Sequence, residues 1–418
     1  MNDHDALLRA LVENPDEDTP RLVYADWLDE HADTLPVPAA VRAHAQFIRD
    51  DIALSRLDEY DPLRLRWELI EKPEREAAGW VRDRLPVLQW GSFARGPLFR
   101  RGFPWAVAVP PGRVGSLSEV PFPLERVQLD RRGRDAVEVL RRAPWRERLR
   151  TIEFANLGGT SPTDVLSPFA LERLERLAFL SDAINPAEAR ALVASPLFRR
   201  LTALTITRAP VGQAVAEAMV GEGAATGLRE LHLTNSRVPA DALVDLLGSH
   251  AANCLETLAL GGDRIGAPQK FRAFERALAL PPVRALDVGD ERPGEAGIES
   301  LLASALPPRL CRLDLSRCWL SGDCIRALAG GGFGALRVLR LHSNPAGNDG
   351  AVALARAPHL AGLLVLNLGY SQVGDEGVEA ILESPLADGL VLLDLTGSPA
   401  SEEMKEVLKA RMGDRVRV

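Results

Sequence analysis

The sequence is poor in several features that would point to a particular class of protein. It has only four cysteines in 418 residues, which gives no disulfide framework. Aromatic residues make up 5%, a proportion that suits many thin hydrophobic cores better than one thick core. It contains no run of about 18 apolar residues, so we expect no transmembrane helix. The start, MNDHDALLRALVENPDED, lacks the basic and apolar regions of a secretory signal, and we therefore expect a cytoplasmic protein.

Signals for catalysis and for nucleic-acid binding are also missing. The formal net charge of −8 disfavours a nucleic-acid partner, because phosphate groups are bound by basic surfaces. The sequence contains no Walker A loop, no dinucleotide glycine fingerprint, no G-x-S-x-G and no H-E-x-x-H. We therefore predict a protein that is not an enzyme and that carries no cofactor.

A tandem repeat organises most of the chain. The pattern apolar-x-x-apolar-x-apolar occurs eleven times, and its first residue is called position one below. The position-one residues are Leu124, Leu149, Leu174, Leu201, Leu228, Leu255, Val283, Leu310, Leu336, Leu363 and Leu390. All ten intervals between them measure 25 to 28 residues, which indicates a repeat architecture.

Each repeat should form one strand and one helix. The apolar spacing changes within a period from two to three or four, as in VPADALVDLLGSH, and prolines follow many of the expected helices. One such unit cannot bury its apolar faces alone, so the units must stack. Because helices are wider than strands, the stack should curve. We predict an α/β fold, a curved solenoid with a concave parallel sheet and convex helices.

This repeat resembles leucine-rich repeat proteins of the ribonuclease-inhibitor-like subclass. The resemblance covers residues 99–418, about 11 to 12 repeats. It implies that the side chain at position nine, usually Asn or Cys, binds backbone groups of neighbouring repeats. In five of the later repeats this position holds Asp263, Cys318, Asn344, Ser371 and Ser398, whereas earlier repeats have Arg132, Leu157 and Ala209.

The first 98 residues lack the repeat and should form a small helical domain that caps the array. PRLVYADWLDE at 20–30 and AQFIR at 45–49 resemble the bacterial repeat-companion domain, for which no activity is implied. Five of the seven tryptophans, Trp27, Trp67, Trp80, Trp90 and Trp105, are expected to anchor this domain. Residues 1–61 carry a net charge of −10 and residues 62–150 one of +8, so the acidic helices either dock on the basic segment or are solvated separately.

Two groups of residues resemble metal ligands. One consists of Cys311, Cys318 and Cys324, but their spacings of seven and six residues differ from the usual pairing of zinc ligands. The other consists of Asp26, Asp29, Glu30 and His31 on one expected helix. An exposed acidic face explains the second group more simply, so we predict no metal site.

The concave face of the last repeats is the candidate site. Positions three, five and seven of each repeat should point to solvent there. The last three residues at position three are apolar, and we expect them to form an exposed stripe with a polar rim. The candidate residues are Arg312, Asp314, Val338, Arg340, His342, Val365, Asn367, Leu392 and Asp394. We predict a scaffold that binds an unidentified protein or peptide there.

Two other functions stay open on the sequence alone. In the first, the N-terminal helical domain is an enzymatic or metal-binding module that the repeats deliver to a target. In the second, the protein regulates a GTPase, as some ribonuclease-inhibitor-like proteins do, although no residue points to this function.

Overall fold

The computed structural model describes residues 3–73, 99–104, 106–109, 123–130, 133–143, 145–156, 161–167, 169, 171–181, 183–221, 227–263, 267–277 and 280–418. The chain divides into two compact units, Met1–Ala178 and Phe179–Val418. The predicted domain boundary at residues 98–99 lies at the edge of a stretch outside the described residues and stays a prediction.

The first unit begins with the predicted helices. They are α1 (Asp3–Glu13), α2 (Thr19–His31), α3 (Pro38–Ser55) and α4 (Pro62–Arg66), followed by the π-helical turn η2 (Trp67–Glu71). Helices α2, α3 and α4 each have a proline in the first turn, where a missing backbone N–H costs no hydrogen bond. Helices α1 to α3 enclose a core that includes Leu11, Tyr24, Leu28, Ile48 and, from a later strand, Phe103.

The tryptophans of this segment are only partly described. Trp67 is buried, and its Nε1 donates a hydrogen bond to Asp51 Oδ1 at 2.9 Å. Trp27 packs against the core from its edge and is partly buried. Trp80, Trp90 and Trp105 lie outside the described residues.

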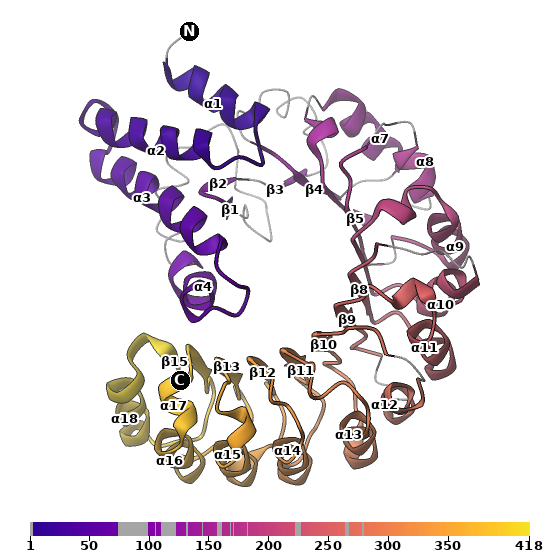
Figure 1. The fold of residues 1–418 in the computed structure, drawn as a ribbon, viewed down its shortest axis with the longest axis vertical. Coiled ribbons are helices and arrows are strands. Elements are labelled where there is room, and N and C mark those ends of the chain that lie inside the picture. The colour runs from indigo at the N-terminus through magenta and orange to yellow at the C-terminus, as the bar shows by residue number, and fades with distance from the viewer. Residues whose placement is uncertain are drawn as a thin grey trace. The chain divides into compact units, whose positions relative to one another are not determined.

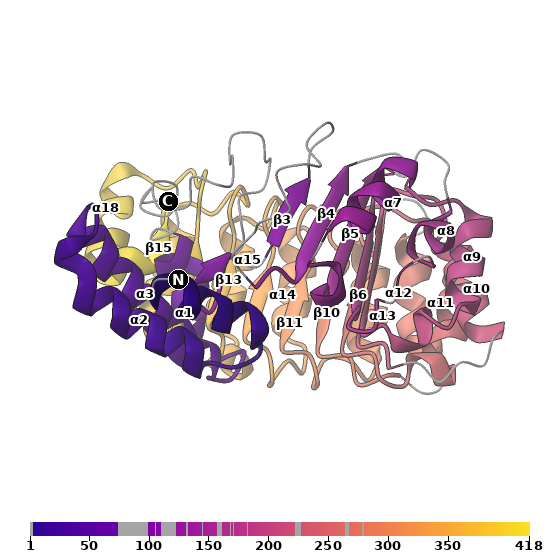
Figure 2. The same ribbon diagram turned by 90° about the horizontal axis from the view of Figure 1, so that it is seen from above.

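The first repeats follow in the same unit. Strands β1 (Phe99–Arg100) and β2 (Phe103–Pro104) pair antiparallel. Strands β3 (Ala106–Val109), β4 (Arg126–Asp130) and β5 (Thr151–Asn156) then pair in parallel, side by side in Figure 2. Helices α7 (Gly133–Arg142) and α8 (Pro162–Leu166) follow β4 and β5, and the unit boundary falls within β6 (Arg176–Leu180).

The second unit is a regular array of strands and helices. Its strands are β7 (Ala203–Thr207), β8 (Glu230–Thr234), β9 (Thr257–Ala259), β10 (Ala285–Asp287), β11 (Arg312–Asp314), β12 (Val338–Arg340), β13 (Val365–Asn367), β14 (Leu392–Asp394) and β15 (Val416–Arg417). Its helices are α9 (Pro186–Ala194), α10 (Gly212–Gly221), α11 (Ala240–Leu247), α12 (Ala267–Arg276), α13 (Gly294–Ala303), α14 (Gly322–Ala329), α15 (Gly347–Ala355), α16 (Asp375–Glu383), α17 (Pro385–Gly389) and α18 (Glu402–Met412).

These strands form a parallel sheet in chain order, and within this unit they line the inner side of an arc with the helices outside (Figure 1). The position-four leucines stand side by side, for example Leu286, Leu313, Leu339 and Leu366, and all are buried. The predicted fold class, a leucine-rich-repeat solenoid that follows a helical N-terminal segment, is confirmed.

Position nine has the role that the resemblance implies. Asn344 Nδ2 donates to the carbonyl oxygens of Leu315 at 2.9 Å and Leu341 at 2.8 Å. Its Oδ1 accepts from the backbone N–H groups of Cys318 and Leu320, both at 3.0 Å. One side chain therefore satisfies four backbone groups in two repeats, all of which are shielded from water.

Position eight is a regular feature that the sequence did not reveal. From Ser181 onward its φ is positive in nine successive repeats, between 53° and 98°. This left-handed conformation turns the N–H toward the next repeat, as in Arg317 to His342 O at 2.8 Å and Tyr370 to Thr396 O at 2.7 Å. The turn after each strand is therefore tied to its neighbour by a backbone hydrogen bond.

We predict that Asn344→Ala lowers the free energy of unfolding by about 3–5 kcal/mol, because two buried N–H groups and two carbonyl groups lose a partner. Urea unfolding followed by circular dichroism measures the change. Asn348→Ala is the matched control, since that side chain accepts one hydrogen bond, from Gly374 N at 2.7 Å, and should cost about 1 kcal/mol. Equal losses in the two variants would contradict the role of position nine.

Candidate partner-binding surface

The three apolar residues of the predicted stripe are not exposed. Val338, Val365 and Leu392 stand next to one another on adjacent strands and are only 3%, 4% and 5% exposed. Parallel strands lie about 4.8 Å apart, so each of these branched side chains shields the next. The prediction of an exposed apolar centre at this place is wrong.

The polar residues at position five support the backbone of their own strand ends. The side chains of Asp287, Asp314, Asn367 and Asp394 each accept a hydrogen bond from the N–H two residues later, at 2.9 to 3.0 Å. Such Asx turns explain why Asp and Asn recur there without reference to a ligand. The second oxygen of Asp394 accepts from Asn367 Nδ2 at 3.2 Å.

Charges of both signs lie on this face. Arg340 Nη1 lies 3.6 Å from Asp314 Oδ2, and the arginine side chain is 43% exposed. Arg312 lies on β11, the same strand as Asp314, and is half-buried. Desolvation by the neighbouring strands and repulsion from the Asp314 carboxylate raise the pKa of Asp287, although its side chain remains accessible to solvent. A partner with a cationic group would relieve this repulsion.

Two exposed aromatic side chains flank this face, and the sequence-based prediction missed both. Trp319 is 69% exposed and Tyr370 is 59% exposed, and both have left-handed backbone, with φ of 57° and 53°. The guanidinium carbon of Arg292 lies 5.1 Å from the centre of the Trp319 ring. The ring of His342 meets that of Tyr370 edge-on, with centroids 5.5 Å apart. The candidate residue His342 therefore belongs to an aromatic pair. We call the segment after the strands, which carries Trp319 and Tyr370, the loop edge.

A buried charged cluster was also missed. Lys270 Nζ lies 2.6 Å from Asp263 Oδ2 and 2.9 Å from Glu291 Oε1, and all three side chains are almost fully buried. Glu291 stands at position nine, as does the acidic Asp263 of the preceding repeat, whereas the following repeats have Cys, Asn or Ser. Its Oε2 has no hydrogen-bond partner within the described residues. Burial raises the pKa of Glu291, and Lys270 opposes this effect.

Several residues of the two groups that resemble metal ligands make other contacts. Asp26 and Asp29 each receive a 2.7 Å bond from Arg49, the arginine of AQFIR, which ties α3 to α2. His31 stacks on Trp27 and bonds its carbonyl oxygen at 2.9 Å. Cys318 is buried with Sγ 3.3 Å from Val288 O, and burial raises its pKa to about 12. Among the described residues, His, Cys, Asp and Glu form no group of three that could hold a metal ion.

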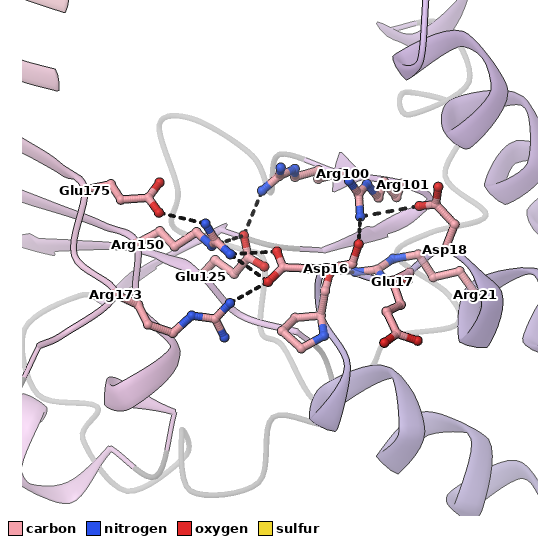
Figure 3. Close-up of polar contacts among 11 residues, drawn as sticks. Asp16, Glu17, Asp18, Arg21, Arg100, Arg101, Glu125, Arg150, Arg173 and Glu175 are labelled. Atoms are coloured by element: carbon pink, nitrogen blue, oxygen red, sulfur yellow. Dashed lines mark hydrogen bonds and ion pairs between the residues drawn. The ribbon is translucent and has the colours of Figure 1, made fainter. Parts of the chain in front are cut away.

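Within the first unit, the acidic N-terminal segment contacts arginines of the early repeats. Asp16, in the turn between α1 and α2, forms ion pairs with Arg150 and Arg173 (Figure 3). Asp18 lies 3.4 Å from Arg101. Of the two alternatives that the charge distribution left open, docking is therefore the observed one.

The comparisons with known proteins support the repeat assignment in one segment. The leucine rich repeat family model matches residues 363–382, which contain β13 and most of α16. A search of curated proteins gives no match. No helix among the described residues is long and apolar enough to cross a membrane.

Three solved structures are similar to this chain at low identity. A chain of the yeast Rad7 and Elc1 complex is 17% identical, over 67% of this chain and 78% of that one, with a TM-score of 0.44. A Bacteroides fragilis protein is 16% identical, over 60% and 77%, with a TM-score of 0.43. A chain of the TLR13–ssRNA13 complex is 15% identical, over 73% of this chain and 47% of that one, with a TM-score of 0.33. At these values none of the three carries an argument about function.

We predict that Lys270→Met lowers the free energy of unfolding by about 3–5 kcal/mol at pH 7, because it leaves two buried carboxylates without their cation. The loss should shrink as the pH falls toward 4.5, the ordinary value for Glu291, because its raised pKa lets the buried carboxyl take up a proton early. Urea unfolding at several pH values measures both effects.

The control is Arg276→Met on the same helix, whose exposed pair with Asp241 should contribute at most about 1 kcal/mol. A loss for Lys270→Met that is the same at every pH would contradict the assigned electrostatic cause.

Proposed function

We propose that the chain is a non-enzymatic scaffold that binds a protein or peptide partner on the concave face of its last repeats. The binding surface comprises the polar residues of β11 to β14 and the adjacent loop edge with Trp319 and Tyr370. The observation that carries the proposal is the exposure of these two large aromatic side chains beside an ordered polar face.

Exposed aromatic residues of this size favour an interface over a solvated surface. Tryptophan, tyrosine and arginine contribute most to the binding energy of protein interfaces, since they combine a large apolar area with a polar group. Trp319 and Tyr370 leave most of that area in water in the free chain. Their burial by a partner would supply the apolar contribution that the buried stripe of Val338, Val365 and Leu392 cannot.

The polar residues would set the orientation of the partner. Asp314, Arg340, Asn367 and Asp394 are spaced by the strands, and three of them are held by Asx turns. Fixed polar groups lose little conformational entropy when a partner binds. The presence of both signs of charge, with Asp314 beside Arg340, favours a partner that also carries both signs.

The remaining expectations belong to this proposal. We infer that residues 1–98 act as a companion domain that caps the first repeats, in a bacterial protein of the cytoplasm. Contacts such as Asp16 with Arg150 support the capping role, because they join the helical segment to those repeats. The partner itself is defined only by its chemistry.

We predict that Trp319→Ala combined with Arg340→Glu reduces partner affinity at least about 100-fold, since hot-spot aromatic and charged contacts are each worth about 2 kcal/mol. The partner is first isolated by affinity capture with the wild-type chain from its native cells. Its dissociation constant for each purified variant is then measured by surface plasmon resonance.

Arg326→Glu is the matched control, because it makes the same charge change on the outer helix α14, where the side chain is 56% exposed. Unchanged affinity of the folded double variant would remove this surface from consideration. The variants leave Val338, Val365 and Leu392 unchanged, because a charge at a buried position such as Val365 would disturb folding and not only binding.

A further inference from the structure

Three arginines converge on one acidic residue, Asp16, in the first unit. Arg150 Nη2 lies 2.7 Å from both carboxylate oxygens of Asp16. Arg173 Nη2 lies 2.5 Å from one of the same oxygens. Arg101 Nη1 donates to the backbone carbonyl oxygen of Asp16 at 2.6 Å, so three guanidinium groups surround a single residue (Figure 3).

The repeats hold Arg150 in place without the help of Asp16. Glu125, Arg150 and Glu175 occupy position two of three successive repeats. Arg150 Nη1 donates to Glu175 at 2.8 Å, and its Nε lies 3.8 Å from Glu125. Arg100 Nη1 donates to the same Glu125 at 2.8 Å. Arg150, the arginine that contacts both carboxylate oxygens of Asp16, is therefore ordered from the repeat side.

The repeat side of this cluster carries more positive than negative charge. Arg100, Arg101, Arg150 and Arg173 supply four positive charges, and Glu125 and Glu175 supply two negative ones. The repeat side alone thus has an excess of two positive charges. Asp16 reduces this excess by one charge, whereas Asp18 is shared between Arg101 and Arg56, which directly follows α3. A phosphate group brings about two negative charges on one centre, with three oxygens for the surrounding guanidinium groups.

Asp16 can leave the cluster at low cost. Its side chain is 52% exposed, and exposed ion pairs contribute little to stability. Partial burial would raise the pKa of Asp16, but Arg150 and Arg173 outweigh it and hold that pKa below 3.8, so the group is charged near pH 7.

The turn itself is fixed by another residue. The buried Arg21 donates to the carbonyl oxygens of Pro15, at 2.7 Å, and Glu17, at 2.5 Å. Burial and repulsion from Arg101 lower the pKa of Arg21 to about 10, which still leaves it charged. Loss of the Asp16 carboxylate should therefore leave the backbone of the turn unchanged.

We infer that Arg101, Arg150 and Arg173 form a binding site for a phosphate group, which Asp16 of the same chain occupies in the free protein. A ligand that carries phosphate displaces the Asp16 side chain and takes over its bonds to Arg150 and Arg173. The site lies among the first repeats and is independent of the proposed partner-binding surface.

The test compares two neighbouring acidic residues. Asp16→Ala removes the competing carboxylate, whereas Glu17→Ala removes an adjacent negative charge that makes no ion pair among the described residues. Inorganic phosphate is titrated into each full-length variant by isothermal calorimetry at constant ionic strength. We expect Asp16→Ala to bind phosphate about tenfold more tightly than the wild type, and Glu17→Ala to match the wild type.

A second variant separates specific binding from a general change in charge. Adding Arg173→Ala to Asp16→Ala should return the affinity to the wild-type level or below. Equal affinity in all variants, or an increase in Glu17→Ala as large as in Asp16→Ala, would overturn the site. If Asp16→Ala unfolds, Asp16→Asn keeps the side-chain volume and carries the same expectation.

A phosphoserine peptide titrated in parallel identifies the source of the phosphate. Tighter binding of the peptide than of inorganic phosphate assigns the site to a phosphorylated protein. Equal binding assigns it to free phosphate. Absence of binding for both probes in Asp16→Ala contradicts the proposal.

Discussion

The structure of the second unit depends on the way that each repeat completes the hydrogen bonds of its neighbours. Position eight turns its N–H to the next repeat, and the position-nine side chain satisfies groups that would otherwise be buried without a partner. The inward leucines then stack in register at strand spacing. Residues at the outward positions have the same spacing as the inward leucines. The side chains of the concave face are therefore held at regular positions by the packing beneath them.

The fold followed from periodicity, but the exposure of side chains did not. The eleven-fold pattern and the role of Asn344 were predicted correctly, because burial of leucines and satisfaction of backbone groups are local and repeated. The stripe of Val338, Val365 and Leu392 was predicted to be exposed, because alternation along a strand gives direction only. Alternation does not show how much of an outward side chain is covered by the side chain beside it on the next strand.

The residues that were missed lie outside the positions that alternation selects. Trp319 follows its strand at position ten of its repeat, and Tyr370 follows its strand at position eight. An alignment of the repeats extended to these two positions would have shown both aromatic residues. Glu291 was visible as a charged residue at position nine, but its partner Lys270 comes from a helix of the preceding repeat. Only the folded chain shows that this lysine neutralises it.

The contact between the N-terminal turn and the early repeats shows the same division. Charge asymmetry along the chain favoured docking as one of two outcomes. The choice of Asp16, and of Arg150 and Arg173 more than 130 residues later, could not come from local pattern, because the contact depends on how the helical segment packs. Charge along the chain thus left a contact between the segments as one of two alternatives, and the packing of the folded chain decides that it forms and between which atoms.

Hydroxyl-radical footprinting of the complex tests the central claim, that the loop edge and concave face of the last repeats bind the partner, most directly. With the captured partner bound, Trp319 and Tyr370 should lose most of their reactivity, while Met404 on the outer helix α18 should keep its own. Full reactivity of both aromatic side chains in a saturated complex, with protection confined to other segments, would contradict the account.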